Sequence, residues 1–124
     1  MPRSVIVLSS DPDLFDNVRA LLRTDPRFVD GGDTVHCDGS MAPLTNIYPV
    51  ENDPAEWDDR DVATDAMPDP RTSSLLIFES RSPEWVAEVG TLLAEGLASP
   101  VWIVDSAENV WSADQIDPAR VALS

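Results

Sequence analysis

Two strand-to-helix units constrain the fold of this chain more than any other feature. The apolar runs VIVL, within residues 4–9, and LLIF, within residues 73–80, are each followed by a capping residue, a proline and an acid. This order favours a helix start, because the cap accepts backbone N–H bonds, proline has no N–H to lose and the acid faces the positive end of the helix dipole. Strands and helices are therefore expected to alternate in a layered α/β domain.

The first helix is predicted to be capped by Asp11 or Ser10, with Pro12 at its first helical position, and to end near Thr24. Apolar residues recur along it with helical spacing. They predict one buried face, made of Leu14, Val18, Leu21 and Leu22.

The second helix is predicted to open at SPEW, residues 82–85, and to end near Gly96. Its expected buried stripe consists of Trp85, Val86, Val89, Leu92 and Leu93. Trp102 and Trp111 also lie in periodic segments, so we expect them in the core rather than in a binding site.

Four further segments are predicted strands. The segment 100–106 is apolar, 110–116 alternates like a half-buried outer strand, and 33–38 and 43–50 could pair as a hairpin. Runs that are apolar at every position are typical of parallel strands covered on both faces. We therefore predict one α/β domain over residues 1–124, with two main helices and a mixed sheet of about five to six strands.

An acidic, proline-rich loop is predicted at about residues 51–72. Its first twenty residues, ENDPAEWDDRDVATDAMPDP, hold eight carboxylates and three prolines, which leave room for regular structure only in a short piece. Loops longer than about 12–15 residues in compact domains tend to be functional or disordered. This loop is therefore the first candidate for a binding segment.

The chain has a formal net charge of -15 and contains no lysine. Such an excess repels nucleic acid phosphates and anionic membranes, so neither is expected as a partner. A basic protein partner is expected instead, because opposite fields steer encounter. The charge could equally reflect the background of an acidic or GC-rich proteome, and composition does not separate the two explanations.

No enzymatic motif is present in the sequence, and we expect neither catalysis, a cofactor nor a metal. GxGxxG and GxxxxGK[ST] are missing, and the absence of glycine from 40 to 89 excludes an EF-hand loop in the acidic segment. Adjacent His36 and Cys37 would point to opposite faces of a strand. A small hydrolase that uses loop carboxylates with a divalent metal stays an alternative.

Two acids, Glu79 and Asp105, follow apolar runs directly. The carboxyl ends of parallel strands are common ligand sites, whereas Asp and Ser also suit turns and caps. We favour turn formation for both. The single cysteine cannot form an internal disulfide, and the N-terminus has only a short apolar run, so a cytoplasmic location is expected.

The segment VIVLSSDPDLFDNVRALLRTDPRF, residues 5–28, resembles the opening strand and helix of receiver domains from bacterial response regulators. Ser9 and Ser10 stand where those domains carry an acidic pair, and their lysine has no counterpart here. The resemblance thus implies at most a degenerate regulatory domain without phosphoryl acceptance.

The segments SPEWVAEVGTLLAEGLASPVWIVDS and VWSADQID, in a small acidic α/β chain, resemble bacterial immunity proteins of polymorphic or contact-dependent toxin systems. The resemblance implies a toxin inhibitor that covers the active-site cleft of a cationic toxin domain, such as a nuclease or a nucleotide-degrading enzyme.

Under this resemblance, the acidic loop supplies the partner-binding residues. Trp57 would be the aromatic anchor, because tryptophan is enriched among binding hot spots, although it could instead fold onto the sheet as a lid. The charged residues would pair with the partner's cations, Asp58, Asp59 and Asp61 at the centre and Glu51, Asp53 and Glu56 at the rim.

Overall fold

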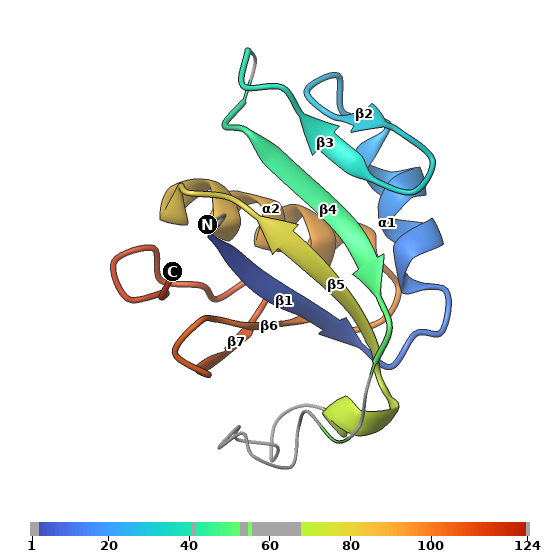
Figure 1. The fold of residues 1–124 in the computed structure, drawn as a ribbon, viewed down its shortest axis with the longest axis vertical. Coiled ribbons are helices and arrows are strands. Elements are labelled where there is room, and N and C mark those ends of the chain that lie inside the picture. Colours follow the sequence, from blue (N-terminus) through green and yellow to red (C-terminus); the bar gives the residue numbers. More distant parts are fainter. Residues whose placement is uncertain (1–2, 41, 53–54, 56–67, 124) are drawn as a thin grey trace.

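The protein is a single α/β domain in which one antiparallel sheet carries two helices (Figure 1). The computed structural model describes residues 3–40, 42–52, 55 and 68–123. The elements are, in chain order, β1 (Ser4–Ser9), α1 (Leu14–Leu22), β2 (Val29–Asp30), β3 (Val35–Cys37), β4 (Thr45–Val50), the 3₁₀ helix η2 (Pro70–Thr72), β5 (Ser74–Glu79), α2 (Pro83–Gly96), β6 (Trp102–Val104) and β7 (Val110–Ser112). The predicted α/β class and the two main helices are confirmed.

The sheet has the strand order β2-β3-β4-β5-β1-β6-β7, and all of these neighbours pair antiparallel. The sheet thus has seven strands, more than the predicted five to six, and the parallel pairing expected in a mixed sheet is wrong for the described strands. The reason is that β1 lies between β5 and β6. These two strands run in the same direction but never touch, although α2 connects them.

The elements β1, α1, β4, β5, α2 and β6 form two interleaved β-α-β units. This is the β-α-β-β-α-β, or split, arrangement, with β2 and β3 inserted after α1 and β7 added at the far edge. The acidic segment connects β4 to β5, which are neighbours in the sheet.

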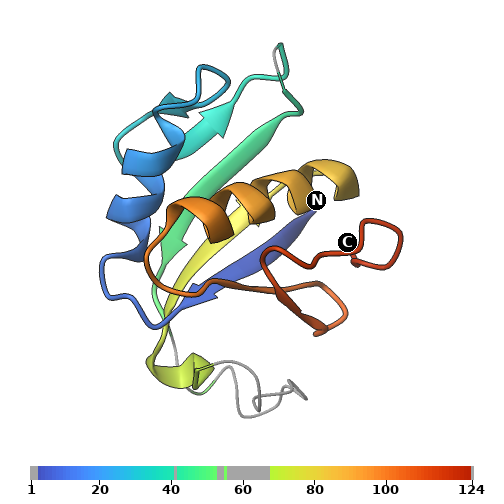
Figure 2. The same ribbon diagram turned by 180° about the vertical axis from the view of Figure 1, so that it is seen from behind.

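Both helices cover the same face of the sheet, which Figure 2 shows from the helix side. The main core lies between them and the sheet. Leu14, Val18 and Leu22 of α1 are buried there, as predicted. From α2, the residues Trp85, Val86, Val89 and Leu93 are buried, whereas Leu92 is only half-buried.

The start of α1 differs from the prediction. The helix begins at Leu14, and its N-cap, Asp13, makes no side-chain cap hydrogen bond. Asp11 instead closes a turn ahead of the helix, since its carboxylate accepts the Asp13 N–H at 2.9 Å and its carbonyl accepts the Leu14 N–H at 3.2 Å. The local hydrogen bonds of Asp11 thus compete with helix capping.

The start of α2 is as predicted. The Ser82 hydroxyl accepts the Trp85 backbone N–H at 3.2 Å, and Pro83 occupies the first turn. The predicted hairpin is also confirmed, because β3 pairs with β4. β2 was not predicted, because it is only two residues long.

Gly90 lets α2 approach the segment that follows β7. A Cβ at this position would lie 2.4 Å from the Ala113 carbonyl oxygen and 2.8 Å from Cδ1 of Ile116. The first of these atoms belongs to the backbone, so a methyl group could be accommodated only if the helix or the segment moved.

We predict that Gly90→Ala lowers the free energy of unfolding by about 1–3 kcal/mol, the usual cost of overpacking, although alanine is the better helix former. Urea denaturation followed by circular dichroism measures the change. Glu95→Ala, at an exposed position of the same helix, is the control and should change stability by less than about 0.5 kcal/mol. An unchanged midpoint for Gly90→Ala would contradict the close contact.

Candidate functional site

The acidic connection between β4 and β5 is anchored at both ends. Glu51 is exposed directly after β4, and the next residue, Asn52, donates from its side-chain amide to the carbonyls of Pro70 at 2.6 Å and Ser73 at 2.9 Å. The other predicted partner-binding residues lie outside the described part of the chain: Asp53, Glu56, Trp57, Asp58, Asp59 and Asp61.

The far end of this connection is capped by Asp69. Its carboxylate accepts the Arg71 backbone N–H at 2.9 Å, and its carbonyl accepts the Ser73 hydroxyl at 2.8 Å. Together with Asn52, these bonds hold the two ends beside one another at one end of the sheet (Figure 1).

The sheet face that neither helix covers is apolar at its centre. Directly opposed residues of an antiparallel pair lie on the same face, so the register places side chains in rows across the strands. One row is Tyr48, Ile77, Ile6, Val104 and Val110, and the next is Val50, Leu75, Leu8, Trp102 and Ser112. We call these two rows the open-face rows.

The open-face rows form a second apolar cluster apart from the main core. Leu8, Leu75 and Val104 are buried in it, with half-buried Ile6, Val50, Trp102 and Val110 packed around them. Trp102 therefore lies on this face rather than in the main core, whereas Trp85 is 5% exposed in the main core and half-buried Trp111 packs against it.

Acidic groups flank the open-face rows. At one end, the Tyr48 hydroxyl donates to the Glu79 carboxylate at 3.0 Å, and burial together with this carboxylate raises the pKa of Tyr48. At the other end, Glu51 follows β4. Over Ile6 and Val104, a cavity of about 360 Å³ is bordered by Glu108. Apolar rows with acids around them are suited to contact a partner that is both apolar and basic.

Asp105 is a buried carboxylate, 4% exposed, that organises the C-terminal turns. It accepts the backbone N–H groups of Ala107 and Asn109 at 2.9 Å and of Ala122 at 3.1 Å, and the Trp111 indole N–H at 3.0 Å. Burial alone would raise the pKa of Asp105, but the indole and backbone donors outweigh it and hold the pKa below its usual range. The predicted turn-forming role of Asp105 is confirmed.

Glu79 does not form the turn that we predicted for it. The residue after it does so, because the Ser80 hydroxyl accepts the Ser82 N–H at 3.2 Å ahead of α2. Glu79 instead points to the uncovered face, where it meets Tyr48.

We predict that Asp105→Asn lowers the free energy of unfolding by about 1–3 kcal/mol at pH 7. The side-chain NH₂ group of asparagine would face N–H donors that the Asp105 carboxylate accepts, so some of these hydrogen bonds would be lost. The folded-state pKa of Asp105 is depressed, so its stabilisation is present above the unfolded-state pKa, near 3.9, and is lost as the pH falls through the lower folded-state value. The difference between wild type and variant should therefore shrink below about pH 4.

Chemical denaturation at several pH values measures this difference. Asp33→Asn, at an exposed position, is the control and should stay within about 0.5 kcal/mol of wild type throughout. A gap between Asp105→Asn and wild type that stays constant down to about pH 2 would contradict a titrating role for Asp105.

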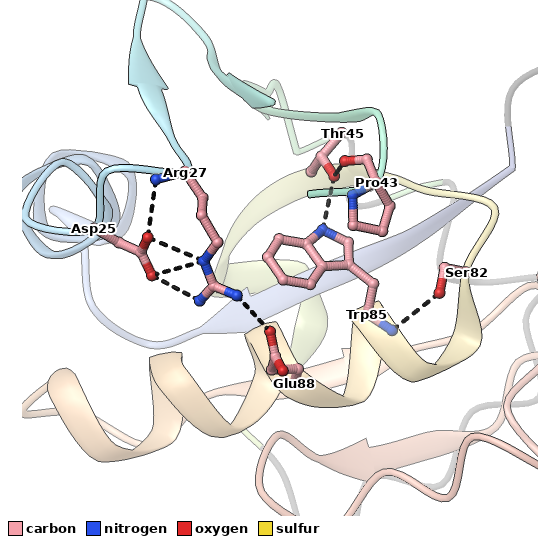
Figure 3. A network of polar contacts seen from close by, with 7 residues as sticks. All are labelled: Asp25, Arg27, Pro43, Thr45, Ser82, Trp85 and Glu88. Atoms are coloured by element: carbon pink, nitrogen blue, oxygen red, sulfur yellow. Dashed lines mark hydrogen bonds and ion pairs between the residues drawn. The ribbon is translucent and has the colours of Figure 1, made fainter. Parts of the chain in front are cut away.

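A polar cluster around Trp85 joins three parts of the fold (Figure 3). The Trp85 indole N–H donates to the Thr45 hydroxyl of β4 at 2.7 Å, and its ring stacks on Phe28 with the centroids 5.7 Å apart. The Arg27 guanidinium lies 4.9 Å from the ring centroid and pairs with Asp25 at 2.7 Å and, on α2, with Glu88 at 2.8 Å.

This cluster is structural, because its polar side chains are satisfied by one another. The Asp25 and Glu88 carboxylates raise the pKa of Arg27, and the Arg27 hydrogen bonds lower the pKa of Asp25. Sequence reasoning missed the cluster, since Arg27 and Glu88 are 61 residues apart.

His36 and Cys37 lie on opposite faces of β3, as predicted, with His36 half-buried and Cys37 buried. Burial raises the pKa of the Cys37 thiol, which keeps it in the protonated form that is a poor nucleophile. In the described part of the chain, no three His, Cys, Asp or Glu side chains are grouped so that they could hold a metal ion. No described helix is long and apolar enough to cross a membrane.

Comparisons with protein families, with curated proteins and with solved structures found no match. Among the described surfaces, the apolar open-face rows next to Glu51 are the best suited to contact a partner.

Proposed function

We propose that this protein works by binding a basic protein partner through the open-face rows and the acidic connection beside them. The observation that supports the proposal most directly is the position of Glu51, the first acid of the connection, immediately after Val50, a member of the open-face rows. The apolar rows and an exposed acid thus adjoin where the connection begins.

The physical roles of the two parts differ. Apolar side chains such as Ile6 and Val110 would supply affinity, because their half-buried surface loses its remaining contact with water when a partner covers it. The acidic connection would supply encounter rate and selectivity, since the formal charge of -15 attracts cations and rejects other acidic proteins.

The partner class that this surface suits is a cationic toxin domain, and the resemblance to immunity proteins supports this choice. A toxin that acts on nucleic acids or nucleotides needs a basic cleft, and a carboxylate-rich surface can occupy such a cleft in place of the substrate. In this proposal Trp57 anchors the contact, Asp58, Asp59 and Asp61 pair with the partner's cations, and Glu51, Asp53 and Glu56 lie at the rim.

The receiver-like alternative is less well supported. Doubly wound folds of that type have a parallel sheet with helices on both faces. Here the described strands pair antiparallel, and both helices lie on one face (Figure 2).

We predict that replacing Asp58, Asp59 and Asp61 together by Asn or Ser weakens partner binding at least tenfold and leaves the fold intact. Loss of two to three charge contacts with the partner would account for a tenfold loss of affinity. The fold should stay intact because charges at protein surfaces generally contribute little to stability. The tagged protein captures its partner from a lysate of the source cells, and a salt gradient elutes it. The expected product is one cationic protein in equal amount, released as salt screens the contact.

Capture that does not depend on salt or on the three aspartates would contradict an acidic interface.

A second pair of variants tests the apolar part: Ile6→Thr and Val110→Thr keep a β-branched side chain but remove apolar surface. We predict that each weakens binding of the captured partner, measured by calorimetry. The control Val29→Thr, at an exposed position on edge strand β2, should bind like wild type.

A further inference from the structure

A groove lies at the opposite end of β5 from the acidic connection. Its volume is about 770 Å³, and it forms where β1 begins, β5 ends and α2 starts. Its lining includes Arg3, Leu44, Asn46, Glu79, Arg81 and Ser82. The six residues of β5 separate the groove from the acidic connection by about 17 Å.

Two arginines of this groove differ from most other arginines in the described part of the chain. Arg19, Arg23, Arg27 and Arg71 each pair with an acid. Arg3 and Arg81 are exposed and form no ion pair with any described acid, although the chain has 23 acidic residues. Both of these arginines line the same groove.

An apolar wall stands beside the two arginines. Leu44 is 68% exposed, more than any other large hydrophobic side chain in the described part of the chain, and Pro43 adjoins it in the lining. An exposed leucine in a groove is a favourable contact for an aliphatic group, because both surfaces leave water on contact.

We propose that this groove binds a carboxylate carried on an aliphatic group. The guanidinium groups of Arg3 and Arg81 would hold the carboxylate by charge-assisted hydrogen bonds, and Leu44 and Pro43 would contact the aliphatic part.

The charge of the lining favours a monoanion. Arg3 and Arg81 contribute two positive charges and Glu79 one negative charge, so the formal sum is +1. A single carboxylate neutralises this sum, whereas a phosphate dianion would leave a negative excess in a protein whose formal charge is already -15. The aliphatic wall adds selectivity for an organic anion over an inorganic one.

Two sources could provide this chemistry: a free short-chain carboxylic acid, or the C-terminal carboxylate of a peptide that ends in an aliphatic residue. Both present one carboxylate next to an aliphatic group, so the site is the same. The difference is that a peptide would also offer backbone groups to Asn46 and Glu79.

The test is a titration followed by ¹H–¹⁵N correlation spectra of the full chain. Hexanoate is expected to shift the amide signals of Leu44, Asn46, Arg81 and Ser82 with a dissociation constant on the order of 1 mM, typical of a very small ligand. Hexanamide, which has the same shape but no charge, is expected to leave them unchanged. Equal shifts with both ligands, or none with hexanoate up to about ten times that concentration, would overturn the proposal.

Variants locate the binding. Arg3→Gln and Arg81→Gln should each weaken hexanoate binding about tenfold, and the double variant should abolish it. The matched control is Arg120→Gln, because Arg120 is exposed and without an ion pair to any described acid but lies at a separate cavity beside Trp111. Loss of binding in this control equal to that in Arg81→Gln would show a general charge effect and overturn the site.

A pentapeptide of four glycines and a C-terminal leucine, made with a free or an amidated C-terminus, distinguishes the two sources of the carboxylate. Tighter binding of the free-acid peptide than of hexanoate would support a peptide C-terminus as the ligand, and equal or weaker binding would support a free carboxylic acid. This groove shares Glu79 with the edge of the proposed partner surface, but its ligand contacts are Arg3, Arg81 and Leu44, which the partner proposal does not use. The hexanoate titration and the partner capture therefore test the two proposals separately.

Discussion

The insertion of β1 between β5 and β6 is the constraint on which the rest of the structure depends. Every residue of β1 pairs with β5, and Ile6, Val7 and Leu8 pair with β6 as well. Because β1 is antiparallel to both, α2 must cross over it to join β5 to β6, and this crossover keeps α2 on the same face as α1 (Figure 2). In the described part of the chain no α-helix covers the opposite face, and the side chains of Ile6 and Leu8 pack there against residues of neighbouring strands.

Two polar clusters hold segments that the strand pairing of the sheet does not fix in place. Trp85 joins α2 to β4 through Thr45, and Arg27 adds the segment after α1 through its contacts with the ring and with Glu88 (Figure 3). Asp105 does the same for the C-terminal segment, where buried donors require an acceptor. Each cluster uses a charged side chain where hydrogen bonds offset its desolvation, which is the condition for burying charge.

The distribution of charge separates structural from functional groups. Most described arginines pair with an acid, such as Arg19 with Asp30, while described acids such as Asp33 and Glu95 are exposed to solvent. The two ends of β5 therefore differ. The acids Glu51 and Asp69 lie at the β4–β5 connection, whereas Arg3 and Arg81, which form no ion pair with a described acid, lie with Glu79 in the groove where α2 begins. An acidic surface suits a basic macromolecule and the groove of Arg3 and Arg81 suits an organic anion, and the two share only Glu79 at their border.

The local elements follow from the sequence alone. The cap and proline at Ser82 and Pro83, and the spacing of Leu14, Val18 and Leu22, depend on neighbours within a turn or two, so they predicted α2 and the buried face of α1. Strand order, the antiparallel pairing and the uncovered face were decided only by tertiary structure. A continuous apolar run such as VIVL is compatible with either a parallel or an antiparallel neighbour, because it specifies burial and not direction. The groove of Arg3 and Arg81 likewise joins residues 78 positions apart, and only the pairing of β1 with β5 brings them together.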